Sequence, residues 1–200
     1  MIRILIREWL GGISLMKRQS PYSIVTTPEI ISLSVGWNEF QDLKYGFWFD
    51  SLSNIDKFIE KIDLSEYDTS NIIDMSVMFA ACPIHHIKLN NFNTNNVISM
   101  HGMFCGCSEL EKLDLSSFDT HNVTNISSMF LGCSSLTELD LSSFDVSNVG
   151  VTHGVFYGCW SLRKIKCKRS FKEWCVAHQS EINLPCSMRE GGHGIWEIID

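Results

Sequence analysis

Residues 113–138 read LDLSSFDTHNVTNISSMFLGCSSLTE, and residues 139–149 continue with LDLSSFDVSNV. The same pattern therefore appears twice, 26 residues apart, and two earlier segments of the chain carry it as well. The four units are residues 62–86, 87–112, 113–138 and 139–164. A period of this length is typical of repeat proteins, in which each unit buries its apolar face against its neighbours.

Three positions of the unit hold one residue type throughout: the tenth is Asn, the eighteenth is Phe and the twenty-first is Cys. Stacked units would place like residues on like residues. We expect the asparagines to form a hydrogen-bonded ladder inside the turn and the cysteines to be buried thiols, with disulfides between units as the alternative. These structural columns are Asn71, Asn96, Asn122 and Asn148; Phe79, Phe104, Phe130 and Phe156; and Cys82, Cys107, Cys133 and Cys159.

Each unit has two halves. In the first half, Leu113 and Leu115 alternate with Asp114 and Ser116, which predicts a short strand with one buried face. In the second half, apolar residues spaced by three, three, one and three positions predict a short helix or 3₁₀ turn. The predicted fold is an α/β solenoid with one short parallel strand and one short helix or 3₁₀ turn per repeat of about 26 residues, capped at both ends.

The two ends of the array need caps. In RSFKEWCVAHQ, Ser170 and Glu173 have the spacing of a capping box, which predicts a helix from about 170 to 179, followed by a turn and a short strand at 194–199. The predicted organisation is a poorly defined N-terminal segment at 1–20, an N-terminal cap with room for a degenerate repeat at 21–61, four repeats and the start of a fifth at 62–167, and a C-terminal cap at 168–200.

Composition excludes several classes of function. The net charge of −7 argues against nucleic acid as a partner, because phosphate contacts need clustered Lys and Arg. The chain has no apolar run of the length that spans a membrane. The segment CPIHH at 82–86, together with His101 and the pair Cys105 and Cys107, lacks the ligand spacing of a zinc site. We therefore expect no cofactor and no metal.

The sequence also gives no sign of catalysis. A G-x-S-x-G elbow and a glycine-rich phosphate loop are both missing. We therefore expect a non-enzymatic, monomeric protein that binds other proteins through the faces of the stack. A second candidate surface is the row of Asp119, Thr120 and His121 with its equivalents, and the ordinary alternative is that all these residues are merely solvated. The candidate binding face is the outward side of the strands, namely Asp63, Ser65, Lys88, Asn90, Asp114, Ser116, Asp140 and Ser142.

Residues 129–149, MFLGCSSLTELDLSSFDVSNV, resemble the repeat of the BspA-like leucine-rich repeat proteins, a repeat type shared with a domain of unknown function in mycoplasma lipoproteins. The resemblance covers about half the chain, 62–164. It implies a leucine-rich-repeat solenoid on a bacterial surface protein, secreted or held at the cell surface, that adheres to host matrix proteins or to bacterial surface proteins.

The N-terminal residues do not support export by themselves. Arg3 begins a basic segment, but Arg7, Glu8 and Gly11 interrupt the apolar stretch, and no small-residue cleavage site follows. A cytoplasmic protein-interaction scaffold or a delivered effector is therefore the alternative to a surface adhesin, and a structural spacer is a third reading.

Overall fold

The computed structural model describes residues 23–27, 30–34, 61–63, 69–82 and 84–199. Among these described residues, strands outnumber helices. The elements are β1 (Ser23–Thr27), β2 (Ile30–Ser34), β3 (Lys61–Asp63), β4 (His86–Lys88), β5 (Lys112–Asp114), β6 (Glu138–Leu141), β7 (Lys164–Lys168), α2 (Arg169–Ala177), the 3₁₀ turn η2 (Cys186–Met188) and β8 (Ile195–Ile199).

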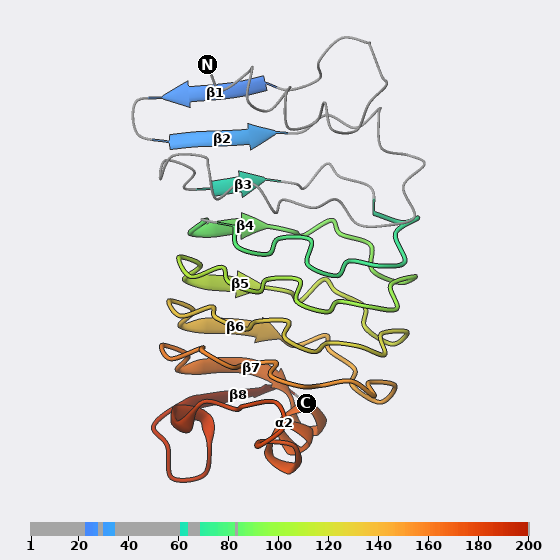
Figure 1. The fold of residues 1–200 in the computed structure, drawn as a ribbon, viewed down its shortest axis with the longest axis vertical. Helices are drawn as coiled ribbons and strands as arrows, with labels where there is room; N and C mark the ends of the chain where they lie inside the picture. The colour runs from blue at the N-terminus through green and yellow to red at the C-terminus, as the bar shows by residue number, and fades with distance from the viewer. Residues whose placement is uncertain (1–22, 28–29, 35–60, 64–68, 83, 200) are drawn as a thin grey trace.

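The strands lie one above another along the long axis of the molecule (Figure 1). They form two four-stranded sheets with the orders β1-β2-β3-β4 and β5-β6-β7-β8. The β1–β2 pair is antiparallel and the other paired strands are parallel. Leu113 pairs with Leu139, and Leu139 pairs with Ile165, so the pairing joins equivalent positions of successive units. The predicted α/β class with parallel strands is confirmed.

The second half of each unit does not form the predicted helix or 3₁₀ turn. Within 69–82 and 84–163 this half is a chain of turns, closed by hydrogen bonds such as Met78 N–H to Met75 O and Cys82 N–H to Phe79 O. The sixteenth and twentieth positions of the unit have positive φ, as the third residue of a type II turn requires. These residues are Val77, Gly102, Ser128 and Gly154, and Ala81, Gly106, Gly132 and Gly158.

The left-handed residues explain why no helix forms. Because of them, the N–H group of every second residue points away from its own turn and toward the next unit. Met75 N–H donates to Ser99 O at 2.9 Å, Val77 N–H to His101 O at 2.7 Å, and Phe79 N–H to Met103 O at 2.8 Å. A helix would keep these donors within its own backbone. Each unit is therefore joined to the next along the turns as well as along the strands.

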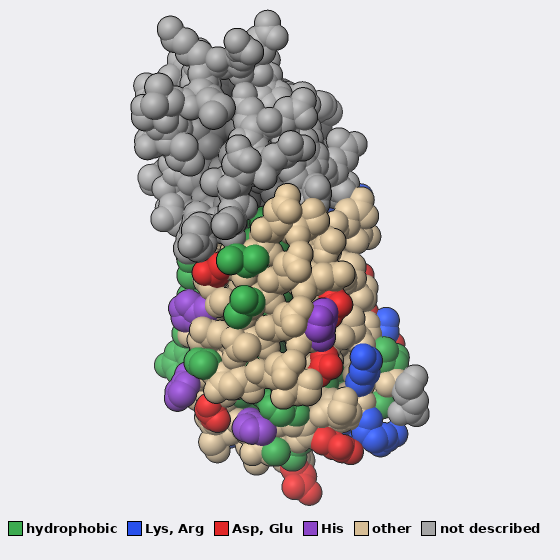
Figure 2. Space-filling view, turned by 90° about the vertical axis from the view of Figure 1, so that its right-hand side faces the viewer, with side chains coloured by type: hydrophobic (Ala, Val, Ile, Leu, Met, Phe, Trp, Pro, Cys, Tyr) green, Lys and Arg blue, Asp and Glu red, His purple; other side chains and the backbone are tan. Residues whose placement is uncertain are grey.

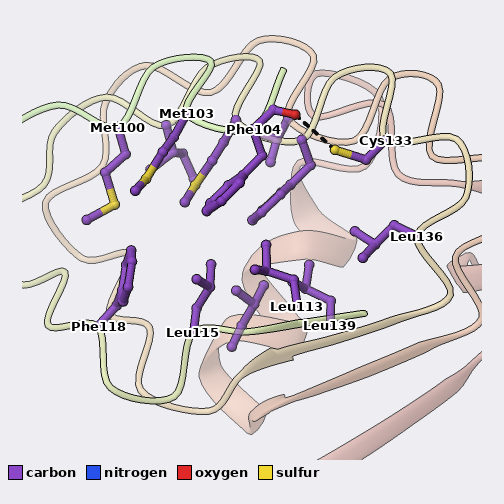
Figure 3. Packing of buried hydrophobic residues seen from close by; sticks show 14 of the residues in the cluster. Met100, Met103, Phe104, Leu113, Leu115, Phe118, Cys133, Leu136 and Leu139 are labelled. Carbon is purple, nitrogen blue, oxygen red and sulfur yellow. Dashed lines mark hydrogen bonds between the residues drawn. The ribbon is translucent and has the colours of Figure 1, made fainter. Parts of the chain in front are cut away.

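The core lies between the strands and the turns. Figure 3 shows Met100, Met103 and Phe104 on the turn side facing Leu113 and Leu115 on the strand side, and all five are buried. The Phe104 ring stacks on Phe79 at 5.4 Å and on Phe130 at 5.9 Å. Phe130 in turn stacks on Phe156 at 5.6 Å. The repeated apolar residues thus pack against their own equivalents.

The C-terminal end is covered by α2 and β8 (Figure 1). Phe171 of α2 is buried and meets the Phe144 ring edge-on at 6.1 Å. The predicted capping box is wrong: the N-cap residue is Lys168, without a side-chain cap, and Ser170 lies inside the helix. The reason is that β7 runs directly into α2, which leaves no loop in which Ser170 could act as the cap. β8 pairs in parallel with β7.

Most of the predicted N-terminal segment and cap, 1–22 and 35–60, lies outside the described residues. Within the cap, the described part is the β1–β2 hairpin, whose second strand pairs with β3.

Candidate binding surfaces

The cysteine column is buried and belongs to the structure. All eight cysteines are free thiols. Cys107 Sγ donates to Phe79 O at 3.0 Å, and Cys133 and Cys159 make the equivalent bonds to Phe104 O and Phe130 O (Figure 3 draws the Cys133 bond). Each of these three thiols therefore bonds the preceding unit rather than another sulfur.

Burial also makes these thiols poor nucleophiles. It raises the pKa of Cys107 and of Cys159 to about 12, and it raises the pKa of Cys133 well above its ordinary value of 9.0. Because the thiolate is the reactive form, these cysteines are unreactive at neutral pH.

The asparagine column forms a ladder, but it is exposed and it uses backbone acceptors. Asn96 Nδ2 donates to Ser70 O at 2.8 Å, Asn122 Nδ2 to Asn95 O at 2.7 Å, and Asn148 Nδ2 to His121 O at 2.6 Å. The expected position inside the turn is therefore wrong. Since a Thr column two positions earlier fills the interior, the amides remain at the surface.

A buried threonine column was not foreseen. Thr69, Thr94 and Thr120 are buried, and each hydroxyl bonds the backbone of the next unit. Thr120, assigned from the sequence to a surface row, is thus an interior residue. In the last unit the equivalent residue is Val146, where α2 takes the place of a further repeat. The sequence could have revealed this column, because Thr recurs at the eighth position of the first three units and is replaced by Val in the last.

The structure places most of the predicted binding face at the surface. Lys88, Asn90, Asp114 and Ser116 are exposed. Asp140 and Ser142 are half-buried. The side chain of Asp63 and the whole of Ser65 lie outside the described residues.

Several charges on this face already bind neighbouring units. Lys112 Nζ pairs with Glu138 at 2.8 Å, and Lys166 Nζ pairs with Asp140 at 2.9 Å. Asp114 and Asp140 also accept the backbone N–H two residues ahead, which fixes the turn after each strand. Asp114 and Asp140, two of the three aspartates on the candidate binding face, therefore have structural roles.

The opposite side, formed by the turns, exposes apolar side chains among polar ones. Ile98 is 50% exposed and Ile73, at the same position of the preceding unit, is 37% exposed. In Figure 2 the described part of the surface is mostly tan, with hydrophobic, histidine and acidic side chains scattered over it and Lys or Arg side chains along one edge. We call the following exposed residues the turn face: Ile73, Asn96, Ile98, His101, Asn122, Val151 and His153.

Hydrogen bonds hold the polar part of this side in place. Asn122 Nδ2 lies 2.8 Å from His121 Nε2, and His121 Nδ1 lies 2.6 Å from Asp119 Oδ1. This bond from His121 lowers the pKa of Asp119 below its usual range. His101 Nδ1 lies 2.8 Å from Ser127 Oγ in the next unit. The surface is therefore preorganised, which lowers the entropic cost of binding.

Two further properties concern ligands and membranes. Within the described ranges, no three His, Cys, Asp or Glu side chains gather in a way that could hold a metal ion. In the part of the chain that the structure describes, no helix combines the length and apolarity needed to cross a bilayer.

Comparison with known proteins identifies a family. A family model described as a Mycoplasma protein of unknown function, DUF285, matches residues 47–169. This match covers more than half of the 200 residues, and the chain belongs to that family. No curated protein and no solved structure matches the chain.

Proposed function

We propose that this chain is a leucine-rich-repeat solenoid of the BspA-like type that acts as a non-enzymatic protein-binding module. The observation that carries this proposal is the turn face, on which Ile73 and Ile98 are exposed at the same position of the first two units and Val151 is exposed in the fourth. Ile98 N–H donates to Ile73 O at 2.8 Å, so these two residues are held side by side. Apolar centres with a polar rim are typical of protein interfaces.

The turn face is a better candidate than the outward strand face. On the strand face, Lys112 and Lys166 are already paired with acidic residues of neighbouring units. A partner there would have to compete with these ion pairs. On the turn face, Ile98 and Val151 offer apolar area that binding would remove from water.

We further propose that the protein is a bacterial cell-surface adhesin that binds host matrix proteins or other surface proteins. The support is the resemblance of residues 129–149 to BspA-like repeats and membership of a family described from Mycoplasma. An intracellular interaction scaffold or a delivered effector is the second candidate, since the same surface could bind a protein inside a cell.

Surface plasmon resonance against a panel of immobilised extracellular-matrix proteins tests the binding function. The purified chain should bind at least one of them, and Ile98→Asp should weaken that binding about tenfold or more, the loss expected for a central apolar contact. Ser116→Asp adds the same charge on the strand face and is the matched control. Failure to bind any matrix protein would contradict the proposed adhesin, and equal loss with both variants would contradict the turn face.

A further inference from the structure

One corner of the last unit exposes two large aromatic side chains. Trp160 is 69% exposed and Tyr157 is 54% exposed, and their rings meet edge to face with centroids 6.2 Å apart. Arg163 lies beside them, with Nη1 donating to Trp160 O at 2.8 Å. Trp, Tyr and Arg are the residue types most enriched among the dominant contacts of protein interfaces.

Two units earlier, the same corner is acidic. Glu109 and Glu111 are both exposed, and their carboxylates lie 3.7 and 3.8 Å from the ring of His85. Arg163 and Glu111 occupy the same position of their units. A backbone column links them, because Arg163 N–H donates to Thr137 O and Thr137 N–H donates to Glu111 O. Arg163 and Glu111 therefore stand in one row about 10 Å apart, at about 4.8 Å per unit, and Glu109 lies two residues before Glu111.

The size of the side chains along this corner changes together with their charge. The residue equivalent to Trp160 is Ser134 in the third unit and Ser108 in the second. Both serines are small, and Ser134 Oγ donates to Ser108 O, so no large side chain projects from this part of the corner. The corner is therefore large and cationic in the fourth unit, and small and anionic in the second.

A surface with this gradient is complementary to itself. A two-fold axis through the third unit, near Thr137, would bring the fourth unit of one copy against the second unit of the other. Arg163 would then meet Glu109 and Glu111 of the other copy, and Trp160 would cover the low surface at Ser108. The arrangement occurs twice in such a dimer, since a two-fold interface uses one patch on both copies.

We propose that this corner is the interface of an antiparallel homodimer. The charge complementarity between Arg163 and the pair Glu109 and Glu111 selects a second copy as the occupant. The dimer would bury the exposed faces of Trp160 and Tyr157, and it replaces the monomer expected from the sequence. It leaves the turn face of each copy for other partners, so it does not depend on the proposed adhesin function.

Sedimentation velocity on the full chain, with charge reversals, tests the dimer. The wild-type chain should show concentration-dependent dimers. Arg163→Glu and the double variant Glu109→Lys/Glu111→Lys should each raise the dissociation constant about tenfold or more, because each places like charges across the interface twice. Lys168→Glu, an exposed cation away from the corner, should leave dimerisation unchanged.

The most direct test mixes the two charge-reversal variants, Arg163→Glu and Glu109→Lys/Glu111→Lys. The glutamate introduced by Arg163→Glu then faces the two lysines introduced in the double variant, and the natural Glu109 and Glu111 face the natural Arg163. Heterodimers should therefore form from two variants that are separately monomeric, which also shows that both are folded. The proposal is overturned by a wild-type chain that stays monomeric at every concentration, by Arg163→Glu dimers of unchanged affinity, or by a mixture that remains monomeric.

Discussion

The Thr94 hydroxyl makes two hydrogen bonds to a single residue of the next unit. It donates to Asp119 O at 2.8 Å and accepts from Asp119 N–H at 2.7 Å. Thr120 binds Asp145 in the same way. One buried side chain thus satisfies both backbone groups of the residue above it, which would otherwise lie without partners beside the core.

Replacing Thr94 by Val keeps the shape of the side chain and removes both bonds. We expect the free energy of unfolding to fall by about 2–4 kcal/mol, since a donor and an acceptor are left buried and unpaired. Urea unfolding followed by circular dichroism measures the loss. The control is Thr137→Val, because Thr137 Oγ1 makes a single exposed bond to Glu111 O and should lose about 1 kcal/mol or less. Equal losses in the two variants would contradict the role of the buried column.

The left-handed backbone makes a second prediction. Ala81 has φ of 55° at a position where the three other units have Gly. Ala81→Gly should therefore raise the free energy of unfolding by about 1 kcal/mol, because Gly adopts this conformation without the steric penalty of a Cβ. Thermal unfolding measures the gain.

The reverse substitution is the control for that prediction. In Gly158→Ala, the added Cβ would lie 3.1 Å from Gly132 Cα, and φ is 83°. The melting temperature should fall in this variant and rise in Ala81→Gly. A fall in both variants would contradict the prediction, because it would mean that the Cβ of Ala81 does not strain the left-handed backbone.

The buried thiols predict a loss of stability at alkaline pH. In the unfolded chain the thiols release protons near their ordinary pKa of 9.0, whereas in the fold Cys107 and Cys159 keep theirs until the pKa of about 12. Between these values the unfolded state binds fewer protons, so the free energy of unfolding falls as pH rises, by about 1.4 kcal/mol per pH unit for each thiol.

Urea unfolding at a series of pH values above about 8 measures this slope. The double variant Cys107→Ala/Cys159→Ala lowers stability at every pH by removing buried atoms, but it should show a shallower alkaline slope. Equal slopes in the variant and the wild-type chain would mean that these thiols do not account for the effect.

The exposed asparagine ladder predicts a smaller effect. Asn122→Ala removes the bond to Asn95 O and the contact with His121 Nε2, both at the surface, and should lower the free energy of unfolding by about 0.5–1.5 kcal/mol, the net range for a hydrogen bond. The melting temperature should fall in step. Asn90→Ala, an exposed asparagine on the strand face, is the comparison and should change the melting temperature less.

The strands and the core could be predicted because their residues have one physical role. Alternation of Leu113 and Leu115 with polar residues has no other simple reading than a half-buried strand, and β5 begins at Lys112. Phe104 and its equivalents are too large and apolar to stand in a repeated exposed position, and they form the stacked column in the core.

The turns could not be predicted with the same certainty because their spacing is ambiguous. Apolar residues three positions apart suit one face of a helix, but two successive type II turns place Met100, Met103 and Phe104 inward equally well. Gly106 and Gly132 are the kind of residue that favours a left-handed backbone at one position of the unit. At the other such position, Val77 and Ser128 concealed it.

The polar surfaces were harder still, because their residue types suit more than one environment. Thr120 fits a solvated turn and a buried backbone bridge, and only the stacking of the next unit decides between them. Lys112 and Glu138 stand 26 residues apart, and this spacing of opposite charges was a readable sign of their ion pair.

Protease shaving of intact cells that express the chain tests the central claim, a binding protein exposed at the cell surface, most directly. Mass spectrometry of the released peptides should identify fragments from residues 114–164 before lysis, together with known surface proteins and without cytoplasmic markers. Appearance of these fragments only after lysis would contradict the adhesin and favour an intracellular partner.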